Sequence, residues 1–184
     1  NYWNTKTQTR VVENYQALLE SLKEEDYTAY FAQADAYNAD LAALDQPLMN
    51  FHQLENYNDI LNVNGNGIMG YISIPKLGVE LPLYHGVSAE VLNIACGHLE
   101  GTSLPVGGES THSVMSAHRG LPGAKLFTDL DRVELGDTFQ ITILDQILTY
   151  QVDQIKVITP REISDLEIVP GKDYCTLFTC TPYG

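Results

Sequence analysis

The sequence predicts a mainly β domain, a barrel or a sandwich, with a helical extension on its N-terminal side. Residues 4–44 repeat apolar side chains at helical spacing. From residue 68 onward, short apolar runs alternate with Gly, Pro and Asn turn signals. Thr138–Ile143 alternates strictly between polar and apolar residues, which is typical of a half-buried strand. Together these patterns favour many short strands closed into a barrel or stacked as a sandwich.

Two amphipathic helices are expected within residues 4–44. The apolar stripe of the first consists of Val11, Val12, Tyr15, Leu18, Leu19 and Leu22. The stripe of the second consists of Tyr27, Tyr30, Phe31, Ala34, Tyr37 and Leu41. We expect Asp26 to cap the second helix and Pro47 to end the pattern. Residues 1–44 are therefore interpreted as a helical extension that packs on the main domain.

Residues 45–67 are polar and irregular, and they are interpreted as a connecting loop that could serve as a lid. Residues 68–184 form the predicted β domain. Its first strands are Ile68–Ile74 and Val79–Tyr84, and a tight turn is expected at Asp145-Gln146. The last strand-like run is Tyr174–Cys180.

Composition excludes several classes of function. The formal net charge of −14 argues against nucleic acid and against docking on anionic lipid, since both need a basic surface. No run of 18 apolar residues and no signal peptide is visible in the sequence. No Cys or His cluster has zinc spacing and no acidic string has calcium spacing, so no metal is expected.

The three cysteines do not indicate a disulfide framework. Cys175 and Cys180 lie roughly 16 Å apart in an extended strand. A disulfide requires Cα atoms within about 7 Å, so these two cannot pair. Cys175 is expected to pack away from the face of Cys180, and Cys96 is expected to be buried in an apolar stretch.

Cys180 is the candidate nucleophile because it ends a strand-like run just before a turn. A thiol is intrinsically a strong nucleophile, but it needs a nearby base or cation to work efficiently. Five histidines could assist it: His52, His85, His98, His112 and His118. His118 is favoured because an apolar run gives way to Gly120 there, which again indicates a strand end. His118 and Cys180 lie 62 positions apart, so the sequence alone does not show that they are neighbours.

Two motifs carry a family resemblance. Thr176-Leu177-Phe178-Thr179-Cys180 resembles the Thr-Leu-x-Thr-Cys signature of sortases, and Ser116-Ala117-His118-Arg119-Gly120 resembles the segment with their catalytic histidine. From Gly67 to Gly184 the chain is similar to class C, the pilin-polymerising branch in Gram-positive bacteria. Supporting stretches are Gly70–Pro75, Leu83–Gly86, Gly97–Pro105, Gly120–Pro122, Leu126–Leu130 and Cys180–Gly184. The two N-terminal helices also fit that branch.

The resemblance implies an eight-stranded β-barrel and a cysteine transpeptidase. Cys180 would attack the Thr–Gly carbonyl of a Leu-Pro-x-Thr-Gly-like sorting signal and form a thioester. His118 would protonate the leaving amine and then help to deprotonate the incoming lysine amine of a pilin subunit. No cofactor is implied, the substrate-binding residues are not identified, and a monomer is expected. The implied location is the extracellular face of the bacterial membrane or the cell wall, with any tether outside these residues.

The sequence departs from the family in two places. Sortases carry a catalytic arginine on the strand after the cysteine, and none of Arg10, Arg119, Arg132 or Arg161 matches that position. We therefore expect the 184-residue chain to lack its last barrel strand and to be impaired, since an oxyanion donor is typically worth about 3–4 kcal/mol. Class C enzymes also place an Asp-Pro-aromatic motif over the cysteine. Here Asp45-Gln46-Pro47-Leu48 has different spacing, which leaves Phe51 or His52 as candidates to fill the groove.

Three alternatives to a pilin-polymerising enzyme stay open from the sequence. One is a sortase that anchors proteins to the cell wall. Another is a non-catalytic extracellular binding or pilus-structural domain in which Cys180 is buried. The third is a cysteine peptidase that hydrolyses its substrate. His98 is expected to be structural, hydrogen-bonded under a loop, and His85 has no implied catalytic role.

Overall fold

The computed structural model describes the backbone of residues 2–180 and the side chains of residues 6–23 and 26–180. Seven strands form a single sheet in the order β6-β5-β1-β2-β3-β4-β7. Their bounds are β1 Ile68–Ile74, β2 Val79–His85, β3 Cys96–His98, β4 Thr111–Ser116, β5 Thr138–Ile143, β6 Gln146–Gln151 and β7 Asp173–Phe178. The pairs β2–β3 and β4–β7 are parallel, and the other pairs are antiparallel.

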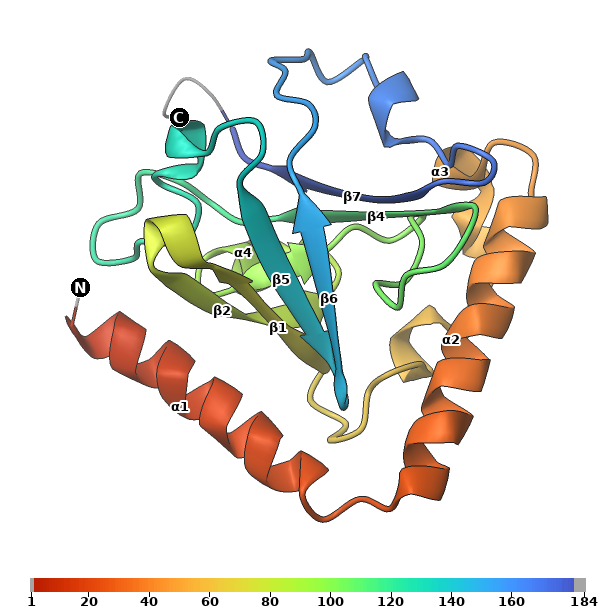
Figure 1. Cartoon of the computed structure of the whole chain (residues 1–184), viewed down its shortest axis with the longest axis horizontal. Helices are drawn as coiled ribbons and strands as arrows, with labels where there is room; N and C mark the ends of the chain where they lie inside the picture. Colours follow the sequence, from red (N-terminus) through yellow and green to blue (C-terminus); the bar gives the residue numbers. More distant parts are fainter. Residues whose placement is uncertain (1, 181–184) are drawn as a thin grey trace.

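The sheet curls into a nearly closed barrel with helices on its outside (Figure 1). Its outer strands, β6 and β7, are linked by a side-chain hydrogen bond in which the Tyr150 hydroxyl donates to Asp173 Oδ1 at 2.9 Å. Residues 2–180 thus contain seven strands rather than the eight of the expected barrel. The mainly β barrel class is confirmed.

Four helices accompany the sheet in the described part of the chain: α1 Tyr2–Leu19, α2 Glu24–Ala43, α3 Pro47–Asn50 and α4 Ala89–Leu92. Short 3-10 turns lie at η1 Phe51–Gln53, η2 Tyr57–Asp59, η3 Pro75–Leu77, η4 Leu130–Arg132 and η5 Ser164–Leu166. In Figure 1, α1 and α2 run along two sides of the barrel. The two long helices therefore lie where the apolar stripes predicted them.

Polar contacts fix α1 and α2 on the barrel. The Tyr15 hydroxyl donates to Met69 O at 3.0 Å and accepts from Leu144 N at 3.2 Å, so α1 is joined to β1 and to the β5–β6 turn. The Asn38 side chain makes two hydrogen bonds to the backbone of Leu104. Its Nδ2 donates to Leu104 O at 3.1 Å, and its Oδ1 accepts from Leu104 N at 2.7 Å. Both side chains are buried, so these bonds compensate polar groups that burial would otherwise penalise.

The structure corrects several element boundaries. Asp26 is not the cap of α2; Lys23 precedes the helix, and the Asp26 carboxylate reaches back to accept from its N–H at 2.9 Å. Pro47 begins the one-turn helix α3 rather than simply ending the pattern, because proline fits the first helical position. The tight turn lies at Leu144-Asp145, where Leu144 has φ of 52°, and the last strand ends at Phe178.

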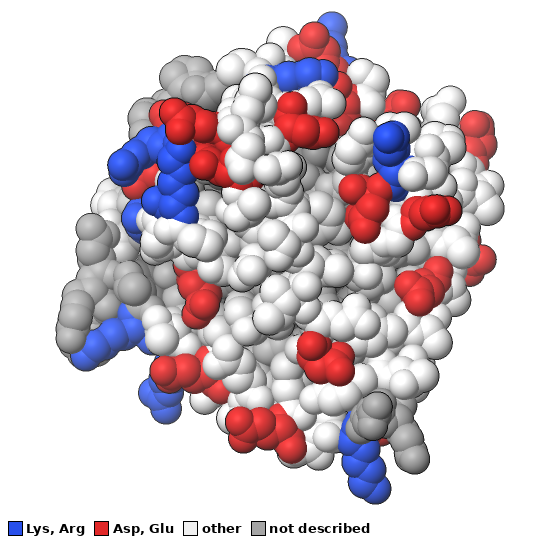
Figure 2. Space-filling model, viewed as in Figure 1, with Lys and Arg blue, Asp and Glu red and all other residues white. Residues whose placement is uncertain are grey.

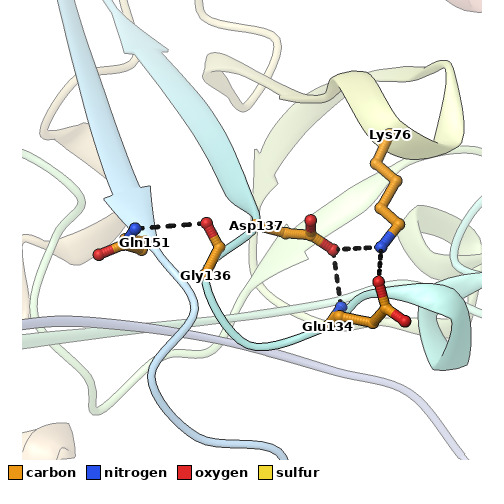
Figure 3. Close-up of polar contacts among 5 residues, drawn as sticks. All are labelled: Lys76, Glu134, Gly136, Asp137 and Gln151. Atoms are coloured by element: carbon orange, nitrogen blue, oxygen red, sulfur yellow. Dashed lines mark hydrogen bonds and ion pairs between the residues drawn. The ribbon is translucent and has the colours of Figure 1, made fainter.

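An exposed ion-pair cluster joins two turns of the barrel. Lys76 Nζ lies 2.5 Å from Glu134 Oε2 and 2.8 Å from Asp137 Oδ2, and the same Asp137 oxygen accepts from Glu134 N at 2.7 Å (Figure 3). Nearby, Gln151 Nε2 donates to Gly136 O at 3.3 Å. The hydrogen bond to Lys76 lowers the pKa of Asp137. Because these charges face solvent, their contribution to stability is small, and their role is to align the β1–β2 turn with the start of β5.

The charged side chains on the surface reflect the acidic composition of the sequence. Figure 2 shows Asp and Glu spread over one face, while the Lys and Arg side chains lie mainly around its edges, several of them at the upper left beside Asp or Glu. The centre of this face carries acidic and uncharged side chains rather than the basic surface that phosphate groups need. Within residues 2–180, no helix has the length and apolar character needed to cross a bilayer.

His98 is a buried structural histidine, as expected from the sequence. Its Nε2 lies 2.8 Å from Ser103 O, and its Nδ1 lies 2.9 Å from the Tyr57 hydroxyl. A carbonyl oxygen can only accept, so Nε2 carries the proton and Nδ1 accepts from Tyr57. Burial lowers the pKa of His98 from 6.5 to about 4, so the folded protein holds the ring neutral.

This burial predicts a loss of stability in acid. The unfolded chain binds a proton at His98 near pH 6.5, whereas the folded chain resists it down to about pH 4. The stabilisation is complete above 6.5 and is lost as pH falls towards 4, by on the order of 3 kcal/mol. Urea unfolding at several pH values should show this slope, and His98→Gln should flatten it. Exposed His52→Gln is the control, and equal slopes in all three proteins would contradict the prediction.

Candidate active site

The parallel pairing of β4 with β7 places side by side the two strand ends that lead to His118 and Cys180. Thr111 lies opposite Asp173 and Ser116 lies opposite Phe178, so residue n of β4 faces residue n+62 of β7 throughout. His118 and Cys180 each follow the last paired residue of their strand by two positions and share the same offset. Neighbouring strands are about 4.8 Å apart, and in-register side chains of parallel strands point to the same face. His118 and Cys180 therefore follow adjacent strands at the same end of the barrel.

Side-chain hydrogen bonds carry this register beyond the strands. The Thr179 hydroxyl donates to Ala117 O at 2.8 Å, and the Ser116 hydroxyl lies 3.3 Å from Phe178 O. Thr179 directly precedes Cys180, and Ala117 directly precedes His118. One hydrogen bond thus joins the residue immediately before Cys180, the candidate nucleophile, to the residue immediately before His118, its candidate proton-transfer partner.

Away from the candidate site, the side chain of His112 on β4 is hydrogen-bonded to β7. Its Nδ1 lies 2.8 Å from Glu167 O, and its Nε2 lies 2.7 Å from Thr176 Oγ1. Because the carbonyl can only accept, Nδ1 carries the proton and Nε2 accepts from the Thr176 hydroxyl. Burial lowers the pKa of His112, which favours this neutral form. The first threonine of the cysteine signature is therefore a partner of β4, which the sequence did not reveal.

The three cysteines differ in exposure. Cys180 is exposed, Cys175 is half-buried and packs against the core, and Cys96 is fully buried. Burial raises the pKa of the Cys96 thiol and of the Cys175 thiol, so both are held protonated and poorly reactive. A thiol must be reachable by substrate to act as a nucleophile. The alternative of a non-catalytic domain assumed a buried Cys180, and the exposure of this thiol contradicts that assumption.

The residues around His118 are also held by the chain that follows. The His118 carbonyl accepts from Phe127 N at 3.1 Å. The Arg119 guanidinium lies 3.3 Å from Asp131 Oδ2 and 3.3 Å from Thr128 O. Arg119 is thus committed to the loop after His118, in keeping with the expectation that it does not replace the family's arginine.

The segment expected as a lid contacts the β3–β4 connection. Phe51 lies against Gly101, where an added Cβ would come within 2.7 Å of its ring. In Figure 1, α3 lies toward the end of the barrel at which β7 begins. Its lid role stays a prediction. Among residues 2–180, no three His, Cys, Asp or Glu side chains are grouped so that they could hold a metal ion.

Comparison with known proteins matches this arrangement to one family. Residues 72–184 match the Sortase domain family. The chain belongs to the sortase family. Sortases are cysteine transpeptidases, and acyl transfer of that kind needs an accessible thiol such as the exposed Cys180. Residues 181–184 of the Cys180–Gly184 stretch lie outside the described residues.

Solved structures place this sortase near class C. Sortase C1 from Streptococcus agalactiae is 46% identical, with a TM-score of 0.87 over 95% of this chain and 91% of that one. Sortase C from Streptococcus pneumoniae is 39% identical, with a TM-score of 0.84 over 94% and 88% of the two chains. Clostridium perfringens sortase C, solved with the C-terminal cell wall sorting motif, is 43% identical, with a TM-score of 0.81 over 96% and 91%.

Curated relatives are more distant in sequence. Sortase A of Streptococcus agalactiae is 29% identical and Sortase D of Bacillus subtilis is 27% identical, each over 62% of this chain. The chain spans about half the length of these relatives, 47% and 54% respectively.

Thr179→Val is predicted to loosen the sortase site without unfolding the barrel. Valine keeps the shape of threonine but cannot donate to Ala117 O, so the two strand ends lose their connecting bond. We expect thioester formation at Cys180 to slow by about tenfold, since small misplacements of reacting groups have large kinetic effects. Single-turnover kinetics would measure the rate, and Thr149→Val on β6 is the matched control. A Thr179→Val protein as fast as the wild type would contradict this role.

Proposed function

We propose that this sortase cleaves a Leu-Pro-x-Thr-Gly-like sorting signal between Thr and Gly and joins the Thr carboxyl to a pilin lysine amine. The observation that carries the proposal is the exposed Cys180 thiol, two residues beyond β7, whose parallel partner β4 ends two residues before His118. Support for the substrate comes from Clostridium perfringens sortase C, whose structure contains the cell wall sorting motif. Support for the pilin class comes from the likeness to sortase C proteins, including the pneumococcal one described in terms of pilin substrate specificity.

The chemistry is two acyl transfers through one thioester. In the first, Cys180 Sγ attacks the Thr carbonyl carbon and its thiol proton passes to His118; the C–N bond to Gly breaks, and His118 gives that proton to the departing amine. In the second, a lysine ε-amine attacks the thioester carbonyl carbon, the C–S bond breaks, and the proton that the amine loses passes through His118 to the departing sulfur. One amide is exchanged for another, so the balance requires no oxidant, nucleotide or metal.

The catalytic arginine of the family stays a prediction. Among the described residues, Arg119 is bound to Thr128 and Asp131, and Arg132 lies near Asp129. An arginine on a strand after Cys180 would supply the positive charge that steadies the oxyanion. The structure describes residues up to Cys180, so this position lies outside it.

The proposed site of action is the extracellular side of a Gram-positive cell, where pilins and wall peptides are both available. The main competing function is anchoring of proteins to the cell wall, in which a wall-peptide amine is the acceptor. A hydrolytic outcome is the default when no amine is present, because water also attacks a thioester.

An acceptor competition tests the proposal. The protein with its native termini would receive a Leu-Pro-x-Thr-Gly peptide together with equal amounts of a lysine-containing pilin peptide and a cell-wall peptide amine. Tandem mass spectrometry would identify the ligated products. Isopeptide product on the lysine supports the proposed function. Product on the wall peptide alone favours the anchoring function, and hydrolysis alone favours a peptidase.

A further inference from the structure

One family-like stretch, Leu126–Leu130, has no role in the acyl transfer described above. It lies in the loop between β4 and β5, shortly after His118. Leu126 and Phe127 are almost fully buried, with 1% and 0% of their surfaces exposed. Leu126 has φ of 40°, which is the left-handed region that a leucine adopts only when its surroundings require it. The segment is therefore anchored in the core in a strained conformation.

Three consecutive residues of the catalytic strand end are bonded to this anchored segment. The His118 carbonyl accepts from Phe127 N at 3.1 Å. The Gly120 N–H donates to Thr128 Oγ1 at 3.2 Å, and Arg119 Nη2 lies 3.3 Å from Thr128 O. Thr128 thus accepts hydrogen bonds from the two residues that follow His118, through its hydroxyl and through its backbone carbonyl.

The burial of Arg119 makes these contacts difficult to lose. Its side chain is 7% exposed, and Asp131, its ion-pair partner, is 63% exposed. A guanidinium that is largely removed from water must keep its hydrogen bonds, because an uncompensated buried charge is strongly unfavourable. Arg119 Nη2 donates to Thr128 O and to the Asp131 carboxylate. The backbone on both sides of Arg119 is thereby restrained.

We propose that Thr128 is a positioning residue for His118, in that its hydroxyl fixes the Gly120 amide and so the direction in which the chain leaves the histidine. The inference rests on the proposed function of His118 as the proton-transfer group. Beyond residue 116 the strand pairing ends, so His118 relies on contacts outside the sheet for its orientation. Bonds from Thr179 on one side and from Thr128 and Phe127 on the other provide them.

Thr128→Val and Thr128→Ser separate positioning from bulk packing. Valine keeps the branched shape and loses the acceptor for Gly120 N–H, whereas serine keeps the hydroxyl. Thr149→Val, the same chemical change on exposed β6, is the matched control. Each protein, with native termini, would be measured for thioester formation with a Leu-Pro-x-Thr-Gly peptide, for its melting midpoint and for amide hydrogen exchange at Gly120.

We expect Thr128→Val to slow acylation by about tenfold with an unchanged KM and an unchanged melting midpoint. Its Gly120 amide should exchange faster, and serine should restore both rates. Equal acylation rates in the valine variant and the wild type would overturn the inference, as would a slow valine variant that serine does not rescue. Hydrogen exchange needs no substrate, so it tests the inference even if no thioester forms. An unchanged exchange rate at Gly120 in the valine variant would overturn the inference. The absence of a thioester in the wild type would instead contradict the proposed function.

Discussion

Cys180→Ala is expected to abolish the covalent intermediate. Incubated with a Leu-Pro-x-Thr-Gly peptide, the protein with native termini should gain the mass of the peptide up to Thr, and the alanine variant should gain none. The structural reason is that Cys180 is the exposed thiol, just beyond the end of β7, while Cys96 and Cys175 are buried or half-buried with raised pKa values. Turnover should fall by at least about 10⁴-fold, as for loss of a catalytic nucleophile elsewhere.

The control for this experiment is Cys175→Ala, which removes a thiol from the same strand region and should leave the adduct in place. Intact mass spectrometry would measure both variants beside the wild type. An adduct on the Cys180→Ala protein would show that another residue carries the acyl group. A wild type without any adduct, although its Cys180 reacts readily with a small alkylating reagent, would count against the sorting-signal substrate.

His118→Gln should have the second-largest effect, through proton transfer rather than through bond formation. Glutamine keeps a polar side chain of similar reach but cannot accept and release a proton near neutral pH. Loss of a positioned general acid–base typically lowers the rate by about 10²–10⁴-fold. We therefore expect thioester formation to slow by that factor in single-turnover kinetics, because the leaving amine departs without its proton.

Small-reagent alkylation of Cys180 should still proceed in the His118→Gln protein, which shows that the thiol stays exposed. Thr149→Val, a substitution of an exposed residue on β6, should acylate at the wild-type rate. If His118→Gln acylated as fast as this control, another group would have to supply the proton.

Much of the fold was accessible from sequence patterns. The stripes through Tyr15 and Leu41 predicted α1 and α2, and the alternation of Thr138–Ile143 predicted β5 with the same bounds. Both signals are local, because helix and strand periods repeat within a few residues. The ends of the helices differed from the prediction: Lys23 rather than Asp26 precedes α2, and Pro47 begins α3. Helix caps depend on which backbone groups the neighbouring loop leaves unpaired, and the sequence pattern does not show this.

The candidate catalytic residues were also visible in the sequence, because Cys180 and His118 each end an apolar run and lie in family-like motifs. The pairing of the strands that precede His118 and Cys180 joins segments 62 residues apart, so only the tertiary structure shows it. The supporting residues Thr179 and Thr128 carried no signal of their own, since a threonine on a strand end or in a loop is ordinary.

The sequence by itself determined which residue types this sortase has available and on which local elements they lie: a thiol at one strand end, an imidazole at another, and two apolar helix faces. The tertiary structure decided that β4 and β7 are parallel neighbours, that Cys180 is exposed while Cys96 is buried, and that Thr128 reaches the chain after His118. These facts depend on pairings between segments far apart in the chain. Such pairings are selected by the burial of the whole core, and no local pattern encodes them.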